Sequence, residues 1–432
     1  MFKRVKQNFR KYPNTFWIVM GATFIDGLGG SMLWPFFGLI FIDRYSISMI
    51  EVGYIFSLFS VGMLVGSVIG GAIADKFGRK FILLFGIFAS GLSSLLFIWV
   101  SYLPLLYVLS ALMGLLGSLG QPAQNAMVAD LLPPEIQTDG YGIFRIVMNV
   151  TVVIGPLLGG LIADYSYNWL FIADAVASTI TGIIVIFTVP ETKPEGTPQQ
   201  KKESFMDTVR GYGHVLKDGV FMFFVLLGSL ISLVYMQMNS TLSVFLNQEY
   251  GFTLQQFSYL LSMNALMVVF LQLPTTWIVK KGSPLILTAL GAFLYAIGFG
   301  LYGFISTIPW FFIAMVIITI AEMIVSPLSQ TITVRLASKD KMARYMAVNG
   351  LSWMLPSLFG VILAGLVMEK MNPNWVWYFG GIFLLIAAVG YILLIPMASS
   401  RFKAIEEELQ ASVIEEVHGP IIEEIPDKPQ IE

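Results

Sequence analysis

The stretch Gly70-Gly-Ala-Ile-Ala-Asp-Lys-Phe-Gly-Arg-Lys80 places four charged side chains within six residues: Asp75, Lys76, Arg79 and Lys80. Apolar runs over roughly 50–74 and 80–101 flank it. About 20 apolar residues are what an α-helix needs to cross a bilayer. We therefore interpret 70–80 as a short charged loop held at the membrane surface between two spanning helices.

The composition agrees with a protein whose solvent is the bilayer. Of 432 residues, 56% are hydrophobic and only 12% are charged, and the mean hydropathy is +0.77. Ordinary globular chains carry about 25% charged residues. In lipid, backbone groups must pair within helices or a closed barrel, and the long runs do not alternate as barrel strands do. The sequence predicts an all-α membrane protein.

Several function classes are disfavoured by what the sequence lacks. There is no Cys, and only two His occur, so we expect no metal site and no cofactor. No Gly-x-x-x-x-Gly-Lys-[Ser/Thr] loop for ATP is present. No Ser-His-Asp arrangement is evident, so we expect no enzyme and no nucleic-acid partner. The sequence therefore predicts no direct use of ATP.

The chain divides into two helical halves with polar segments around them. We expect an N-terminal segment at 1–15, a first bundle at 16–189, a linker at 190–218, a second bundle at 219–397 and an acidic, mobile tail at 398–432. The twelve predicted spans are 16–41, 50–74, 80–101, 104–128, 143–164, 169–189, 219–246, 254–278, 284–306, 309–332, 346–368 and 374–397.

The positive charges predict the orientation. With both termini in the cytoplasm, only Arg44 and Lys370 of the 25 Lys and Arg fall in external loops. Cytoplasmic loops carry an excess of Lys and Arg, so this distribution supports twelve spans and places both ends inside the cell. We expect a multi-pass protein of the cell membrane, monomeric and surrounded by the lipid bilayer.

The two halves repeat each other. A shift of 205 residues places Tyr250 on Tyr45 and Pro327 on Pro122, and it puts a weaker copy of the charged loop at 275–281. Parallel repeats related by an axis along the membrane normal are one plan of secondary transporters. We predict two six-helix bundles related by a pseudo-two-fold axis. The family resemblance carried by the charged loop implies that helices 1, 4, 7 and 10 line a central cavity and that helices 2, 5, 8 and 11 lie at the interface.

The charged loop resembles the loop between helices 2 and 3 of the major facilitator superfamily, Gly-x-x-x-Asp-[Arg/Lys]-x-Gly-[Arg/Lys]-[Arg/Lys]. The matching positions are Gly71, Asp75, Lys76, Gly78, Arg79 and Lys80. The resemblance implies that Asp75 meets the start of helix 11 when the cavity opens outward, and that Arg79 pairs with Asp130 as a latch. The alternative is that these residues only fix the topology.

A second motif lies in helix 5. Gly155-Pro-Leu-Leu-Gly-Gly160 resembles a motif of the drug/proton antiporter branch of this superfamily. Pro156 would kink the helix, and Gly155, Gly159 and Gly160 would allow close helix contact. Two upstream glycines of the fuller motif are replaced by Val147 and Thr151. The alternative is a packing kink that any transporter could use.

Ionisable residues inside the spans are candidate coupling groups, because a charge in the membrane is costly and usually functional. These are Asp26 in helix 1 and Glu322 in helix 10, with Arg145 near the start of helix 5. We expect proton exchange at the acids; a permanent structural pairing is the alternative. Ser110 stands where the antiporter branch carries a helix-4 Arg. Either Arg145 substitutes for it, or coupling uses Asp26 and Glu322 alone, or the protein is not a proton antiporter.

Polar and aromatic residues on the spans are candidates for the substrate cavity. They are Trp34, Gln121, Gln124, Asn125, Asn149, Tyr235, Gln237, Asn239 and Asn264. We expect Trp34 to form an aromatic wall and Pro35 to bend helix 1. The resemblance implies a secondary active transporter, a proton-coupled exporter of hydrophobic or cationic drug-like compounds. The alternative is a carrier of a lipid or small metabolite working by uniport or symport.

Overall fold

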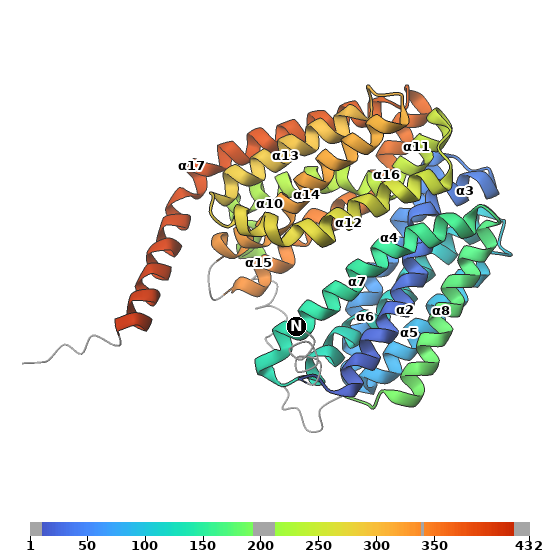
Figure 1. Cartoon of the computed structure of the whole chain (residues 1–432), viewed down its shortest axis with the longest axis horizontal. Coiled ribbons are helices and arrows are strands. Elements are labelled where there is room, and N and C mark those ends of the chain that lie inside the picture. Colours follow the sequence, from blue (N-terminus) through green and yellow to red (C-terminus); the bar gives the residue numbers. More distant parts are fainter. Residues whose placement is uncertain (1–10, 193–211, 338–340, 419–432) are drawn as a thin grey trace, which may run out of the picture.

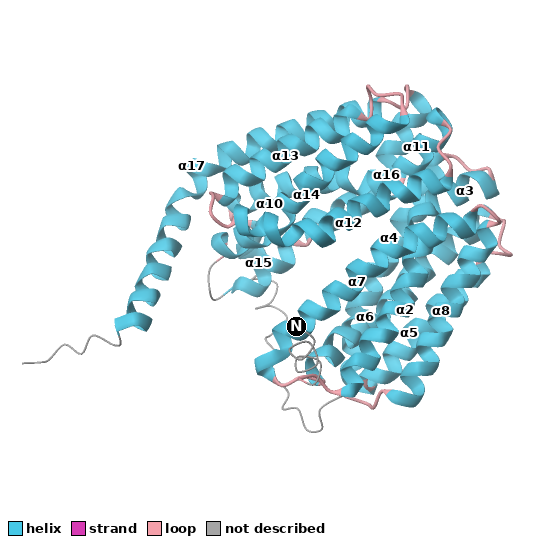
Figure 2. Ribbon diagram, viewed as in Figure 1, coloured by secondary structure: helices cyan, strands magenta, loops and turns pink. Residues whose placement is uncertain are grey.

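The computed structural model describes residues 11–192, 212–337 and 341–418. Every element in this part of the chain is a helix (Figure 2). Twelve of these helices, counting broken ones once, are long and apolar enough to cross a membrane. The first half contains α2 (Asn14–Leu33), η1 (Trp34–Phe36), α3 (Phe37–Tyr45), α4 (Met49–Phe77), α5 (Arg79–Leu96), α6 (Leu103–Asp130), α7 (Pro134–Ala163) and α8 (Tyr167–Thr188).

The second half has the same order of helices. It contains α10 (Gly219–Tyr235), η2 (Met236–Asn239), α11 (Thr241–Tyr250), α12 (Leu254–Val279), α13 (Pro284–Leu301), α14 (Ile308–Leu336), α15 (Met342–Asn349), α16 (Leu351–Lys370) and α17 (Trp375–His418). The halves form two groups of helices that meet near α3 and α11 and separate toward the ends that carry α15 and the start of the chain (Figure 1). The predicted fold of two six-helix bundles is confirmed.

The repeat extends to the chemistry of the helix ends. Ser48 caps α4 and forms a capping box with Glu51, and 205 residues later Thr253 caps α12 and forms a capping box with Gln256. Each box satisfies two backbone N–H groups that a helix start leaves unpaired. The helices before them end in left-handed residues at matching positions, with φ of 52° at Ser46 and 65° at Gly251.

The halves contact each other along two pairs of helices, α4 with α16 and α7 with α12. Glycine makes the first contact close, because a methyl group on Gly53 would lie 2.7 Å from Cα of Ile362. Near this point the backbone N–H of Ile50 donates to Glu369 at 2.9 Å, and Ser57 Oγ donates to the carbonyl of Leu358. All these contacts lie toward the end of the bundles opposite the termini, so this end is closed.

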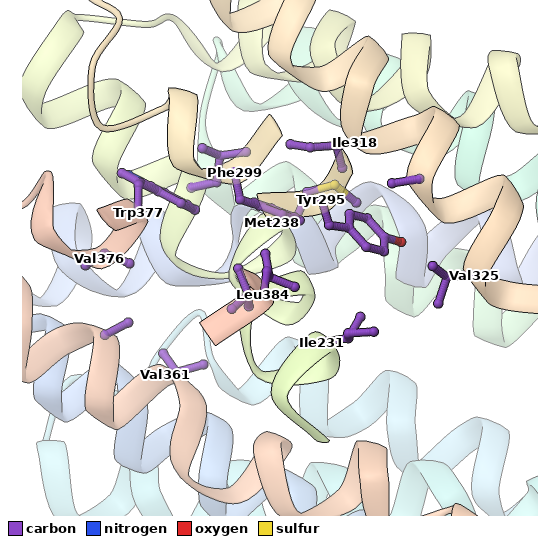
Figure 3. Packing of buried hydrophobic residues seen from close by; sticks show 14 of the residues in the cluster. Ile231, Met238, Tyr295, Phe299, Ile318, Val325, Val361, Val376, Trp377 and Leu384 are labelled. Carbon is purple, nitrogen blue, oxygen red and sulfur yellow. The ribbon is translucent and has the colours of Figure 1, made fainter. Parts of the chain in front are cut away.

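Buried aliphatic and aromatic side chains fill the interior of the second bundle (Figure 3). Trp377 is fully buried, stacks on Phe299 at 6.3 Å between ring centroids and meets Phe245 edge-on at 5.3 Å. Lipid tails are as apolar as these side chains, so close packing rather than escape from water favours this association.

The predicted spans agree with the helices to within a few residues at most ends, with two extensions. The fifth spanning helix, α7, begins at Pro134, before the predicted start at 143, and α17 continues to His418, beyond the predicted start of the tail at 398. The central part of the predicted linker, 193–211, and the last residues of the tail lie outside the described residues, so the domain limits there and the mobility of the tail stay predictions.

Candidate functional site

The first spanning helix (α2, η1 and α3) and the seventh (α10, η2 and α11) are both interrupted. In helix 1, a 3-10 turn at Trp34–Phe36 contains the predicted bend residue Pro35, and in helix 7 the turn spans Met236–Asn239. Discontinuous helices near the middle of the membrane often mark binding sites in transporters, because their freed backbone groups face a cavity. Trp34 contacts Phe59 and Phe56 at ring-centroid distances of 5.0 and 5.2 Å, which makes one aromatic wall.

A cavity of about 260 Å³ lies between the two halves, beside both interruptions. It collects five of the predicted cavity residues, Trp34, Asn149, Tyr235, Asn239 and Asn264, together with the predicted coupling residue Glu322. Asn264 Nδ2 donates to Glu322 Oε2 at 2.9 Å, and the Tyr235 hydroxyl lies against the same carboxylate. We name this the interface cavity. It offers a single carboxylate, held by neutral donors, to a molecule bound between the bundles.

A second, larger cavity of about 640 Å³ lies within the first bundle, and we name it the N-bundle cavity. Asp26, Gln121 and Gln124 line it, and Gln124 Nε2 donates to Thr23 Oγ1 at 2.9 Å. Trp34 lines both cavities. Helix 4 (α6) therefore contributes to this cavity rather than to the interface cavity. The interface cavity is formed by helices 1, 5 (α7), 7, 8 (α12) and 10 (α14).

Asp174 is a second carboxylate of the N-bundle cavity that the sequence interpretation missed. It lies in α8 and is only 6% exposed. The rule that selected Asp26, an ionisable residue inside a predicted span, applies equally to Asp174, which lies five residues into the span at 169–189. Under the 205-residue shift Asp26 falls on Ile231 and Asp174 on Phe379, while Glu322 falls on Gly117. The acids are therefore not repeated.

The charged loop contains a single residue outside helices. Gly78 stands between α4 and α5 with φ of 105°, a conformation that side chains with a Cβ rarely adopt. Arg79 forms an ion pair with Asp130 at the end of α6, and its guanidinium also donates to the carbonyl of Ala126 at 3.3 Å. Asp75 lies in the last turns of α4, and its side chain lies outside the described part of the structure.

Glu191 is a further residue at this loop that the sequence interpretation did not select. Its carboxylate accepts the backbone N–H groups of Arg79 at 2.9 Å and Lys80 at 3.2 Å. These N–H groups begin α5, where the helix dipole favours a negative charge. The Lys80 ammonium donates to the carbonyl of Ile186 at 2.8 Å, near the end of α8. The chain after α8 is thus bonded to the start of α5.

The helix-5 motif makes the contacts expected of small residues. A methyl group on Gly155 would lie 2.8 Å from the carbonyl carbon of Ser31, and one on Gly159 would lie 3.1 Å from that of Met32, both in α2. Gly160 instead faces Ser258 of α12, in the other half. Pro156 lies inside α7 and lines the interface cavity.

The departure from the fuller motif has a structural explanation. Thr151, which replaces an expected glycine, packs against Gly27, where a methyl group would lie 3.2 Å from the threonine side chain. The Thr151 carbonyl also accepts a hydrogen bond from Ser31 Oγ at 2.9 Å. At this one contact, the small residue is Gly27 of helix 1 rather than a glycine of helix 5.

Three predicted site residues lie away from both cavities. Asn125 is exposed, and its backbone carbonyl accepts a hydrogen bond from the Tyr141 hydroxyl. Gln237 is buried and bonds the Leu233 carbonyl and Thr241. Arg145 is exposed, and no hydrogen bond or ion pair within the described residues joins it to Asp26 or Glu322.

Comparison with known proteins agrees with this architecture. The family model described as Major Facilitator Superfamily matches residues 19–361. The chain is 28% identical over 399 residues to a Na(+), Li(+), K(+)/H(+) antiporter of Planococcus maritimus, covering 86% of this chain and 93% of the relative. It is 23% identical over 403 residues to Multidrug resistance protein 1 of Bacillus subtilis (strain 168), covering 90% and 98%.

The fold agrees with a solved transporter. The crystal structure of a mutant form of the nucleoside transporter NupG superimposes with a TM-score of 0.78 at 13% identity, over 88% of this chain and all of the other. Together with twelve apolar spans and two matched bundles, the family match shows that this chain is a multi-pass membrane transporter, not an enzyme, and belongs to the Major Facilitator Superfamily.

Proposed function

We propose that this transporter is a proton-coupled antiporter that exports small hydrophobic or cationic compounds by alternating access. The observation that carries the proposal is Glu322 in the interface cavity, with Asn264 and Tyr235 at its carboxylate. A bare carboxylate in an apolar surrounding is costly, so this group is stabilised by either a proton or a cationic ligand. Occupancy by one then disfavours the other, which is the competition that antiport requires.

The relatives support antiport but do not identify the compound that this protein transports. One is named a cation/proton antiporter and another a multidrug resistance protein, at 28% and 23% identity. The interface cavity has an aromatic wall at Trp34, flexible apolar side chains such as Met238, and the amides of Asn149 and Asn239. Such a lining suits apolar molecules with a positive charge.

We also propose the orientation and the moving parts. The distribution of positive charges supports an orientation with both termini in the cytoplasm, and we propose that the protein is a monomer in the plasma membrane. The closed end at Gly53 then faces outside, so the described conformation opens inward. Transport would swing the bundle at 16–189 against the bundle at 219–397, with Arg79, Asp130 and the loop around Gly71 and Asp75 as the latch.

The test is efflux of a lipophilic cationic dye from proteoliposomes with an imposed pH gradient. We expect Glu322→Gln to abolish the response to the gradient, while downhill exchange of the dye continues. Glu249→Gln is the matched control, because Glu249 is exposed at the end of α11. Gradient-driven efflux by Glu322→Gln at the wild-type rate would remove the proposal. Dye movement that never responds to the gradient would instead favour a carrier without proton coupling.

A further inference from the structure

The carboxamide of Asn264 is held by two neighbours on α14. Asn264 lies on α12, is only 6% exposed and lines the interface cavity. Its Nδ2 donates to Thr319 Oγ1 at 2.9 Å and to Glu322 Oε2 at 2.9 Å. Thr319 and Glu322 are three residues apart, so both side chains lie on the face of α14 that meets Asn264. Both amide hydrogens of Asn264 are therefore used.

Thr319 determines which way round this amide lies. The Thr319 side chain is fully buried, and its hydroxyl donates to the Met315 carbonyl at 2.7 Å. A hydroxyl has one hydrogen to donate, so toward Asn264 the Thr319 oxygen can only accept. An amide turned by half a rotation would place Asn264 Oδ1 against this oxygen, and neither atom would then have a hydrogen to donate. Thr319 thus keeps Nδ2 of Asn264 directed at α14, whether Glu322 is ionised or protonated.

The fixed amide leaves one polar atom for a molecule in the cavity. Asn264 Oδ1 takes part in no hydrogen bond with the residues that the structure describes. It is also not among the fully buried unpaired side-chain atoms of that part of the chain, so it can be reached from the interface cavity that Asn264 lines. A carbonyl oxygen and the Glu322 carboxylate therefore lie close together at the cavity wall. Both are acceptors, and together they fit a donor that carries a positive charge.

This pair of acceptors separates two kinds of organic cation. A protonated amine carries its charge with at least one N–H, so it can meet the Glu322 carboxylate and donate to Asn264 Oδ1. A quaternary ammonium ion has the same charge but no N–H, so its binding would leave Asn264 Oδ1 desolvated and unpaired, which costs free energy. A site built around hydrogen bonds rejects ligands that lack the matching group. The aromatic wall at Trp34, by contrast, favours both kinds of cation.

We propose that Thr319 is a positioning residue that makes the interface cavity prefer protonated amines to quaternary ammonium ions. Thr319 does not touch the bound amine; it acts through the orientation of the Asn264 amide. The inference rests on the proposed function for the placement of a cationic compound beside Glu322. It goes further by naming the group that this compound must carry, an ammonium with an N–H.

The test compares two probes that differ by one methyl group, dimethyl(1-naphthylmethyl)ammonium and trimethyl(1-naphthylmethyl)ammonium. Binding to the purified full-length protein in detergent is measured by titration calorimetry at neutral pH, where the dimethyl probe is protonated. We expect the wild type to bind the dimethyl probe about tenfold more tightly, as one hydrogen bond to a charged group would give. No gradient is applied, so this test and the efflux test on Glu322 can fail independently. Equal affinity of the wild type for the two probes would overturn the proposal, whatever the efflux test shows.

The variants separate positioning from stability. Thr319→Val keeps the shape of the side chain but removes the hydroxyl, so the amide is free to turn. The preference for the dimethyl probe should then fall to about threefold or less, while the affinity for the trimethyl probe stays within about twofold. Thr319→Ser keeps a hydroxyl and should restore the preference. Thr333→Val is the matched control, because Thr333 is also fully buried on α14 and its hydroxyl donates to the Ser329 carbonyl of its own helix at 2.9 Å.

A second variant keeps the proposal testable if Thr319→Val does not fold. Asn264→Ala removes Oδ1 itself and should abolish the preference. An unchanged preference in either of these variants, or a lost preference in Thr319→Ser, would contradict the proposal. An equal loss in Thr333→Val would indicate a general effect of packing in α14 and would also overturn the role of Thr319.

Discussion

Asp218 joins three helices of the second bundle at the end that carries the termini. Its carboxylate accepts from Arg401 at 2.7 and 3.1 Å, from the Tyr345 hydroxyl at 2.7 Å and from the backbone N–H of Phe221 at 3.2 Å. Burial alone would raise the pKa of Asp218, but the bonds from Arg401 and Tyr345 outweigh it and hold this pKa below its ordinary value.

This depressed pKa predicts a pH dependence of stability. Because the folded pKa lies below the unfolded value of about 3.9, the bonds stabilise the folded state fully above about pH 4 and are lost as the pH falls through the folded pKa. We expect Asp218→Asn to lower the free energy of unfolding by about 1.5–3 kcal/mol at pH 7. The deficit should stay constant from pH 8 to 5 and shrink only at lower pH.

Thermal unfolding followed by tryptophan fluorescence across this pH range measures the deficit. Tyr345→Phe serves as the comparison, because it removes one of these bonds and keeps the ion pair with Arg401. A deficit that already declined between pH 7 and 5 would contradict this account.

The sequence could identify site residues whose chemistry is unusual, but not the group each would face. Asp26 and Glu322 stand out because charges are rare in spans, and both line cavities. Gln237 looked like a cavity residue but is satisfied by its own helix, at Leu233 and Thr241. A polar side chain in a spanning helix either lines a cavity or forms hydrogen bonds within its own helix. The periodicity of the sequence does not distinguish these two cases.

At the scale of elements, the crossing of helices 1 and 5 depends on the absence of side chains. Gly155 and Gly159 bring α7 against the backbone of α2 at Ser31 and Met32. The sequence predicted that these glycines make close contacts, but it did not identify their partners, because the pairing of helices depends on tertiary arrangement.

We expect Gly155→Ala to impair the protein through this crossing. The added methyl group would lie 2.7 Å from Cβ of Ser31 and 2.8 Å from its carbonyl carbon, so the backbones must separate. Overpacking of this kind costs about 1–3 kcal/mol. Thermal unfolding and dye efflux should both decline.

Gly142→Ala is the control within the same helix, because nothing lies within 4 Å of the added methyl group. Replacing a glycine by alanine inside a helix stabilises the helix by roughly 0.5–1 kcal/mol. The control should therefore unfold at the same or a higher temperature. Equal behaviour of the two variants would refute the role of the crossing.

For the whole molecule, the sequence predicted twelve spans, the repeat and the four helices at the interface, but not which of these helices pair. It could not determine which end is open, because both conformations of a transporter share one sequence and differ by small energies. The contacts of Ser57 with Leu358 and of Ile50 with Glu369 decide this for the described state.

A covalent link at the closed end should arrest the cycle. The chain has no Cys, so a Ser57→Cys/Leu358→Cys pair can form no other disulfide within the chain. We expect the oxidised variant to lose dye efflux and to regain it on reduction, since the bundles must part here for the cavity to open to the other side. Each single Cys variant is the control. Full cross-linking with undiminished efflux would exclude this movement.

The unequal placement of the acids has a consequence for robustness. Ile231, Phe379 and Gly117 occupy the positions that mirror Asp26, Asp174 and Glu322. The duplicated architecture therefore carries no second copy of these three acids. Pairing two copies of the same half would preserve the scaffold yet remove the buried acids of the other half.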